Sequence, residues 1–236
     1  MRCKMFYCKC TQCQDCVLFE TTFLKDLPQD VKEELGSFIF LTRFKKKQIV
    51  ALEDNPSQNI YIAKTGKFKS YKLLDSGKQQ IIRVNERGDI LNLNSLYEPY
   101  YTESVDAITE AETCTIHKVA FESFLEQKPN VSMLLIKLLT KELSSAHEMI
   151  RDLGQKNARA RVAGYLMSCI DIREHENRSV AVPVPLSRVE IANMIGVTQE
   201  TLTRLLGKLK QEKIIDIDEN HHIIIKNIPR LLKIAR

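Results

Sequence analysis

The sequence contains no tryptophan, only eight glycines and seven prolines among 236 residues, and no apolar run long enough to cross a bilayer as a helix. Its first residues are polar and rich in cysteine, and they lack the apolar segment of a secretory signal peptide. From these absences we expect a protein that makes no membrane contact and is located in the cytoplasm.

Motifs of the common enzyme classes are also missing. The chain has no glycine-rich phosphate loop and no dinucleotide-binding fingerprint. The five histidines show neither metal-ligand nor catalytic-triad spacing. We therefore do not expect an enzyme, and an iron–sulfur redox enzyme is the alternative from another class.

The net charge of +5 is unevenly distributed along the chain. Residues 1–150 hold 20 Lys and Arg against 20 Asp and Glu, whereas residues 151–236 hold 15 against 10, so the whole excess lies in the C-terminal part. A basic surface there would suit the phosphates of a nucleic acid. The same net charge would be ordinary for an enzyme, so the charge alone decides little.

The stretch Leu186–Lys210, LSRVEIANMIGVTQETLTRLLGKLK, predicts two short helices joined by a tight turn. Ser187 is a good N-cap with Glu190 three residues later, and Thr198 can cap the second helix. Gly196 lies at the turn, where we expect a positive φ. Apolar residues repeat at helical spacing on both helices, namely Ile191, Ala192 and Ile195 on the first and Leu202, Leu205, Leu206 and Leu209 on the second. This pattern predicts a helix-turn-helix that binds DNA.

The outer face of the second helix carries the polar residues Gln199, Glu200, Thr203 and Arg204. A carboxylate can accept a hydrogen bond from cytosine, and an arginine can donate two hydrogen bonds to guanine. We expect this face, together with the caps Ser187 and Thr198, to contact DNA. The alternative is an ordinary surface salt bridge between Glu200 and Arg204, which lie four residues apart.

The remaining pattern predicts an α+β fold. Short β-rich runs punctuated by Gly66, Gly77 and Gly88 are typical of an antiparallel β-roll, or jelly roll. Two apolar strands, Ile214–Ile217 and His222–Ile225, predict a β-hairpin wing after the helix-turn-helix. The chain then divides into residues 1–20, a cysteine-rich sensory segment; 21–129, a β-roll sensor domain; 130–154, a dimerisation helix; and 155–236, a winged helix-turn-helix DNA-binding domain.

The long helix has a row of apolar residues, hereafter the dimer seam: Ile136, Leu139, Leu143, Ala146, Ile150 and Leu153. Their alternating spacing of three and four residues is a heptad pattern that no charged residue interrupts. The alternative is a helix that packs on its own domain, a role that Leu134, Leu135 and Leu138 can fill. We expect the dimer seam to form a parallel homodimer.

This order of parts resembles the Crp–Fnr transcription regulators from about residue 10 to about residue 228. The most specific stretches are QKNARARVAGYL at 155–166 and GVTQETLTRLLGKL at 196–209. Within the family the chain is most similar to the Fnr-like branch, including the Flp proteins of low-GC Gram-positive bacteria. The resemblance implies a roll like that of cyclic-nucleotide-binding domains, a dimer that binds an inverted repeat in double-stranded DNA, and contact with RNA polymerase.

The same resemblance bears on the DNA sequence that is bound. Glu200, Thr203 and Arg204 stand at the positions of the Fnr-like base-reading residues, which implies TTGA-like half-sites. The two half-sites would lie about one helical turn apart. Gln199 departs from the small apolar residue often found at its position, and this leaves the outer bases open.

The nucleotide contacts of the cyclic-AMP-binding branch are missing. Leu93 stands where that branch has its ribose-binding acid, and Tyr101-Thr102-Glu103-Ser104 follows without the phosphate-binding arginine. A glutamate beside a cyclic phosphate would repel it. We therefore expect no cyclic nucleotide.

Five of the seven cysteines lie near the N-terminus: Cys3, Cys8, Cys10, Cys13 and Cys16. An odd cysteine count without an export signal argues against a disulfide scaffold and favours metal, cluster or redox chemistry. The spacing of Cys10, Cys13 and Cys16 allows three thiolates to hold one cubane from a single loop. The resemblance to Fnr proteins implies an oxygen-sensitive [4Fe–4S] cluster with Cys114 as the fourth ligand, and with Cys3 or Cys8 as alternative ligands.

Other interpretations of these cysteines stay open. The thiols could form a thiol–disulfide switch without a metal, or a structural zinc site, because four thiolates also suit zinc. A regulator that responds to a small molecule is a further alternative. We expect Cys169, on an apolar helix, to be a buried small hydrophobe. The function that follows is a DNA-binding transcription regulator controlled by oxygen or redox state.

Overall fold

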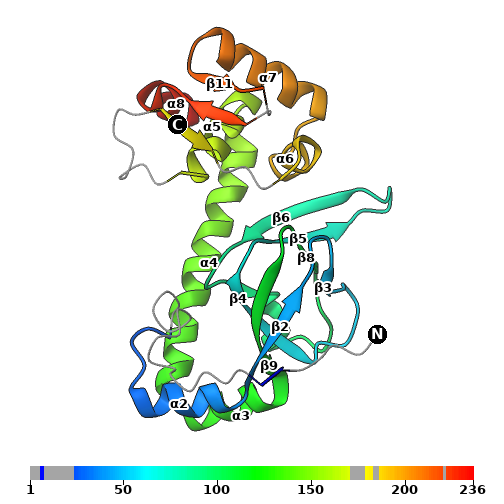
Figure 1. Ribbon diagram of the computed structural model, residues 1–236, viewed down its shortest axis with the longest axis vertical. Helices are drawn as coiled ribbons and strands as arrows, with labels where there is room; N and C mark the ends of the chain where they lie inside the picture. The colour runs from blue at the N-terminus through cyan, green and yellow to red at the C-terminus, as the bar shows by residue number, and fades with distance from the viewer. Residues whose placement is uncertain (1–5, 8–23, 171–178, 183–185, 220–221) are drawn as a thin grey trace. The chain divides into compact units, whose positions relative to one another are not determined.

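The computed structural model describes residues 6–7, 24–170, 179–182, 186–219 and 222–236 (Figure 1). The chain divides into two compact units, Met1–Glu142 and Leu143–Arg236, and one long helix contributes to both. Among the described residues, no helix is both long and apolar enough to span a membrane.

The first unit is an antiparallel β-roll made of two sheets, with the strand orders β1-β2-β9-β4-β7 and β3-β8-β5-β6. The strands are β1 (Phe6–Tyr7), β2 (Ile39–Phe44), β3 (Ile49–Ala51), β4 (Asn59–Thr65), β5 (Phe68–Leu73), β6 (Gln79–Asn85), β7 (Ile90–Leu91), β8 (Ser104–Ala107) and β9 (Ala111–His117). The predicted glycine turns are confirmed, because Gly66, Gly77 and Gly88 all have positive φ. At Gly66 the need is also steric, since an added Cβ would lie 2.5 Å from the carbonyl oxygen of Glu110.

Two hydrophobic cores stabilise the roll. One lies between the sheets and includes Phe44 and Ala63 from the first sheet and Phe68 and Val105 from the second. The other, hereafter the helix-covered core, joins one face of the five-stranded sheet to α2 (Gln29–Ser37), α3 (Lys118–Gln127) and the start of α4 (Pro129–Gln155). A short 3-10 helix, η2 (Leu93–Leu96), follows β7 and lies against β4.

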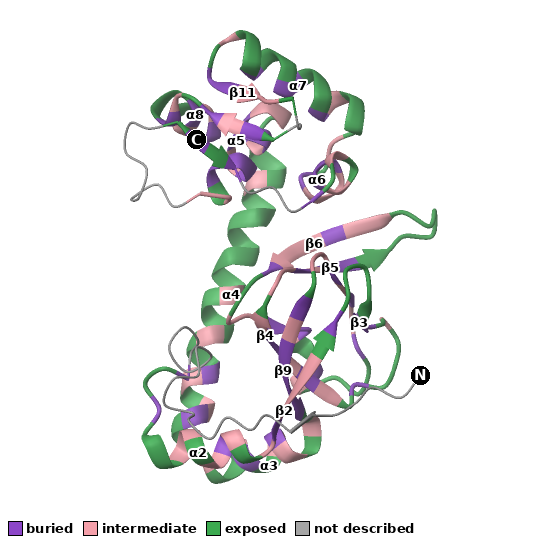
Figure 2. Cartoon of the chain, in the orientation of Figure 1, coloured by how far each residue is buried: buried purple, intermediate pink, exposed green. Residues whose placement is uncertain are grey.

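Helix α4 has two different faces. Val131 and Leu135 are buried in the helix-covered core, and Leu134 and Leu138 pack against it. Figure 2 shows buried residues in the first turns of α4 and exposed residues along its second half. All six side chains of the dimer seam are exposed in the single chain: Ile136, Leu139, Leu143, Ala146, Ile150 and Leu153.

The second unit contains α5 (Ala158–Ser168), α6 (Arg188–Met194), α7 (Gln199–Gln211) and α8 (Ile228–Ala235). The predicted wing is formed by β11 (Ile215–Ile217) and β12 (Ile223–Ile225), each one residue shorter at its start than expected. Strand β10 (Val180–Val182) adds a third strand in the order β10-β12-β11, and neither β10 nor α8 was predicted. The predicted α+β class, with a β-roll, a long helix and a winged helix-turn-helix, is confirmed.

Candidate DNA interface

The helix-turn-helix consists of α6, α7 and the turn between them. Ala192 is buried on α6, and its carbonyl accepts a hydrogen bond from the Val197 amide at 3.0 Å, so the turn folds back onto α6. Gly196 has φ +67, as predicted. An added Cβ there would meet only the Cδ2 of Leu153, at 3.5 Å. The backbone conformation, and not a lack of space, therefore requires glycine.

Both helices begin at their predicted caps. The Ser187 hydroxyl accepts from the Glu190 amide at 3.3 Å, and the Glu190 carboxylate accepts from the Ser187 amide at 2.9 Å, which completes a capping box. The Thr198 hydroxyl accepts from the Thr201 amide at 3.2 Å. These bonds satisfy amides that have no partner inside a helix, and they fix the residue at which α7 begins.

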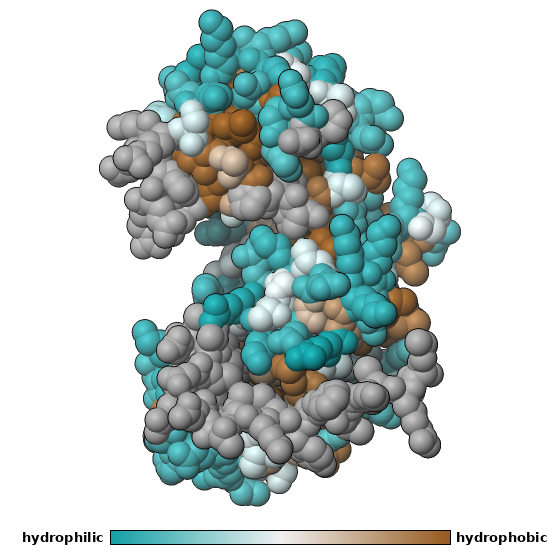
Figure 3. Space-filling model, viewed as in Figure 1, coloured by the Kyte–Doolittle hydropathy of each residue, from teal (hydrophilic) through white to brown (hydrophobic). Residues whose placement is uncertain are grey.

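Helix α7 has one buried face and one exposed face. Its four leucines are buried, whereas the predicted base-contacting residues are exposed: Gln199, Glu200, Thr203 and Arg204. In Figure 3 the surface over α7, at the top of the view, is mostly hydrophilic. An exposed polar face near the N-terminus of the second helix is the arrangement with which helix-turn-helix proteins enter a major groove.

The basic residues around α7 have different roles. Lys210 contacts Asp216 at 3.0 Å and donates to the carbonyl of Ile217 at 3.0 Å, so it fastens α7 to the wing. The hydrogen bond from Lys210 lowers the pKa of Asp216 below its usual value. Lys208 and Lys226 are exposed, which leaves their charges available to phosphates.

Two arginines on α5 hold the two ends of α7, and the sequence pattern did not predict this role. Arg161 donates to the carbonyl of Gly196 at 3.1 Å, just before α7, and Arg159 forms an ion pair with Glu212 at 2.5 Å, just after it. The sequence signal was the placement of two arginines among the apolar residues of α5. Residues two apart on a helix do not share a face, so each arginine can reach a different partner.

The predicted cysteine site lies largely outside the described residues, because Cys3, Cys8, Cys10, Cys13 and Cys16 all fall there. Cys114 is described: it lies on β9, opposite Leu41 and Ile62, with 2% of its surface exposed. Among the described residues, no three His, Cys, Asp or Glu side chains form a metal-binding group. The prediction that Cys169 is buried was wrong, because it is only partly buried at the C-cap of α5, where the helix ends.

Glu103, in the stretch where the cyclic-AMP-binding branch has its phosphate-binding arginine, has charged neighbours. Burial raises the pKa of Glu103, against the opposing effects of a hydrogen bond from Ser70 and the charge of Arg83. Arg83 also donates to Glu142 on α4 and to the carbonyl of Ile90, the latter at 3.1 Å. An arginine is therefore present, but carboxylates of the same chain surround it.

Two family models match the chain. The Crp-like helix-turn-helix domain matches residues 160–234, and the cyclic nucleotide-binding domain matches residues 41–128. The first range lies within the second unit, and the second range lies within the first unit and covers most strands of the β-roll.

Several related regulators align over most of the chain. The nitrogen fixation regulation protein FixK of Bradyrhizobium diazoefficiens is 30% identical over 209 residues, 87% of this chain and 86% of that protein. The anaerobic regulatory protein of Haemophilus influenzae is 24% identical over 227 residues, 94% of this chain and 87% of that protein. The probable transcriptional regulator Flp of Lacticaseibacillus casei is 29% identical over 175 residues, 72% and 77% of the two chains. The solved structure of FixK2 from Bradyrhizobium japonicum superposes with a TM-score of 0.73 at 26% identity, covering 84% of this chain and 98% of that one.

Proposed function

This chain belongs to the Crp–Fnr family of DNA-binding transcription regulators, and from that premise we propose that it acts as a homodimer whose DNA binding responds to oxygen or redox state. Its target would be an inverted repeat of TTGA-like half-sites. The observation that carries the proposal is the exposed polar face of α7, with Glu200, Thr203 and Arg204 next to a capped N-terminus.

Each of the three side chains has a chemical role in this proposal. The Arg204 guanidinium would donate to O6 and N7 of the guanine in TTGA, and the Glu200 carboxylate would accept from the amino group of a cytosine. Thr203 can contribute its hydroxyl to a base or its methyl group to a thymine. Four residues separate Glu200 from Arg204, so both project from the same face of α7 into one groove.

The dimer is supported by the dimer seam. Soluble proteins seldom leave a continuous apolar stripe in water, and such stripes mark interaction surfaces. In the described chain the stripe extends from Ile136 to Leu153 on the side of α4 away from the helix-covered core. A second copy supplies an identical stripe, which is the self-complementary contact of a two-fold dimer.

Redox control is supported by the cysteines and by the name of a relative, the anaerobic regulatory protein of Haemophilus influenzae. In the proposed site Cys10, Cys13, Cys16 and Cys114 would hold a [4Fe–4S] cluster, which supplies a centre that oxygen can oxidise. Thiolates are the donors that such a cluster requires. Cys114 shares the helix-covered core with Leu24 and Leu27.

We further propose that the roll does not bind a cyclic nucleotide. Glu103 would place a carboxylate beside the phosphate, and Arg83, the nearby cation, already bonds Glu142. Isothermal titration with cyclic AMP and cyclic GMP is expected to give no binding heat. Saturable binding of either nucleotide would contradict the proposal.

The DNA proposal is tested by titrating the full-length protein against an inverted TTGA repeat and a scrambled duplex. Loss of a bidentate arginine–guanine contact costs about 1–3 kcal/mol per half-site, or about 2–6 kcal/mol for the two half-sites, so Arg204→Ala should weaken specific binding at least about 30-fold. The control is Arg87→Ala, which removes an exposed arginine from the β-roll and should bind as wild type does. An equal loss on both duplexes would show that Arg204 contacts phosphate and not guanine.

The redox proposal is tested by anaerobic purification followed by absorption spectroscopy and by iron, sulfide and zinc analysis. We expect a coloured protein that contains iron and sulfide and loses its specific DNA binding or gains it on exposure to air. Cys13→Ser should abolish that redox dependence. Colourless protein without iron would overturn the cluster, and zinc content or a reversible thiol change would then identify which alternative holds.

A further inference from the structure

Arg161 lies where the end of α4, the start of α5 and the helix-turn-helix meet. Its Nη1 donates to the carbonyls of Leu153 at 3.1 Å and Lys156 at 3.4 Å, and its Nη2 donates to the carbonyl of Gly196 at 3.1 Å. One guanidinium thus joins the last turn of α4 to the turn that precedes α7. We propose that Arg161 is a positioning residue that sets the orientation of α7 relative to the end of α4. The proposal rests on the proposed function of α7 as the DNA-reading helix.

The chemistry of the acceptors favours an arginine at this position. The last carbonyls of a helix have no amide partner within it, and a cationic side chain can satisfy them. Leu153 belongs to the last turn of α4, so Arg161 bonds a carbonyl of this kind. Only a planar guanidinium offers several donors in a fixed fork, and a lysine ammonium could not hold the same set of carbonyls in one geometry.

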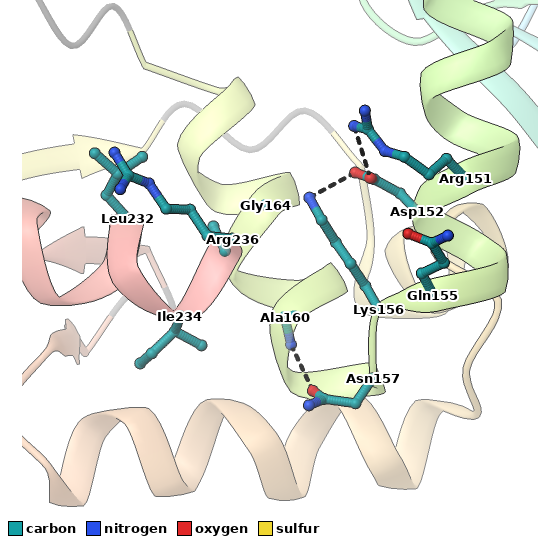
Figure 4. Close-up of a pocket in the computed structure, with 11 residues that line it drawn as sticks. Arg151, Asp152, Gln155, Lys156, Asn157, Ala160, Gly164, Leu232, Ile234 and Arg236 are labelled. Atoms are coloured by element: carbon teal, nitrogen blue, oxygen red, sulfur yellow. Dashed lines mark hydrogen bonds and ion pairs between the residues drawn. The ribbon is translucent and has the colours of Figure 1, made fainter.

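The corner between α4 and α5 depends on hydrogen bonds to keep its shape. Figure 4 shows Lys156 bonded to Asp152 and the Asn157 side chain accepting from the Ala160 amide, with distances of 2.7 and 2.9 Å. An open pocket of about 800 Å³ lies beside this corner and is lined by residues of α4, α5 and α8. Helix α5 packs on α8, and the Arg161 bonds add a direct link from α5 to the last turn of α4 and to the turn before α7.

Arg159 provides an internal comparison. It holds the opposite end of α7 through Glu212, whose carbonyl also accepts from Arg230 at 3.3 Å. Its ion pair joins α5 to the end of α7, and among the described residues it makes no bond to α4. Arg159 therefore tests whether any loosening of α7 is harmful, whereas Arg161 tests the connection to α4.

The connection through Arg161 reaches the dimer seam. Leu153 is the last seam residue, its carbonyl bonds Arg161, and its Cδ2 lies 3.5 Å from the position that a Cβ on Gly196 would occupy. Backbone and side chain of Leu153 are thus both adjacent to the turn before α7. A change in the last turn of α4 would therefore move this turn, and with it the N-terminus of the DNA-reading helix.

The test uses the full-length protein and a duplex that the wild type selects from a random-sequence pool, with a scrambled duplex for comparison. Binding is measured by fluorescence anisotropy over a salt series for Arg161→Ala, Arg161→Lys and Arg159→Ala. Arg87→Ala, which removes an exposed arginine of the β-roll, is the control. We expect both Arg161 variants to lose about tenfold in specific affinity. A tenfold loss corresponds to about 1.4 kcal/mol, which is slightly less than one charge-assisted hydrogen bond contributes. Affinity for the scrambled duplex and the salt slope should match the wild type.

Hydrogen exchange supplies a readout that needs no DNA. Arg161→Ala should speed the exchange of amides at residues 197–201, at the start of α7, and Arg159→Ala should speed exchange at residues 210–213, at its end. Unchanged exchange at 197–201 in the Arg161 variants would overturn the proposal. A wild type that selects no DNA sequence would reject the proposed function, and the exchange data would still decide the role of Arg161.

The binding measurements would also show whether Arg161 contacts phosphate and does not position α7. If Arg161 contacted phosphate, Arg161→Lys would keep the affinity, and Arg161→Ala would weaken both duplexes while reducing the salt slope by about 0.9 for each lost phosphate contact. Wild-type specific affinity in Arg161→Lys would overturn the positioning role. That variant keeps the charge and the aliphatic stem, so it also decides the question if Arg161→Ala fails to fold.

Discussion

Shortening Leu143 should weaken the homodimer by an amount that follows from its exposure. Leu143 lies in the middle of the dimer seam, and 56% of it is exposed in the single chain. Burying a whole leucine side chain contributes about 2 kcal/mol, so burying the exposed part contributes about 1 kcal/mol in each protomer. Two-fold symmetry removes the side chain twice, and Leu143→Ala should therefore cost about 2 kcal/mol, or about 30-fold in the dimer dissociation constant.

Sedimentation equilibrium over a concentration series measures this constant. The matched control is Val119→Ala on α3, which shortens an apolar side chain that is 78% exposed but lies outside the seam. The control should dimerise as the wild type does. The urea midpoint of Leu143→Ala should equal that of the wild type when both are monomeric, because this side chain is outside both cores of the roll. A wild type that remains monomeric at micromolar concentration, or equal effects of the two substitutions, would refute the assignment of the seam.

Three further predictions concern local stability. Gly196→Ala should lower the free energy of unfolding of the second unit by about 1–2 kcal/mol in urea titrations, because alanine is strained at φ +67 while Leu153 leaves room for its Cβ. Ser187→Ala should cost about 1 kcal/mol through the lost cap of α6, and Ser187→Asn, another good cap, should retain most of the stability. Burial raises the pKa of Glu103 above its ordinary 4.5, so the stability that its protonated form contributes is present below pH 4.5 and is lost as the pH rises through the raised value. Glu103→Gln should therefore raise the urea midpoint at neutral pH by an amount that vanishes toward pH 4, and parallel pH profiles of the two proteins would contradict the burial of this charge.

The helix-turn-helix was predictable because local rules determine most of it. The positions of Ser187, Thr198 and Gly196 each follow from a backbone requirement that a few residue types meet, and the structure places a cap, a cap and a positive φ there. The leucines of α7 follow from the 3.6-residue period. Local chemistry therefore fixed the polar face of α7 as the exposed one before any tertiary contact was known.

The long-range bonds that hold the two ends of α7 were not predictable from local sequence. Arg159 and Glu212 are 53 residues apart, and Arg161 and Gly196 are 35 apart. Their placement among the apolar residues of α5 sets these arginines apart, but it does not identify their partners. Their partners are defined only once α5 packs beside α7, and the same holds for β10, which is a strand only because β12 pairs with it.

The roll was predictable in outline but not in its interior. Glycines at three turns and the short β-rich runs between them predicted the roll, and the family resemblance implied that Tyr101–Ser104 lacks the phosphate-binding arginine. The sequence did not show that Arg83 on β6 would reach Glu142 on α4, 59 residues away. That pair links the roll to the long helix inside the first unit.

The helix-covered core provides the other connection between the roll and α4, and Cys114 is part of it. Phe121 of α3 and Val131 and Leu135 of α4 belong to the same core as this cysteine. Close-packed interiors transmit strain because they have few voids that could absorb a change of volume. A change of volume at the Cys114 thiol would therefore reach the first turns of α4 through contacts that the fold already contains. In the proposed redox control, the helix-covered core is thus a route by which the signal would reach the long helix.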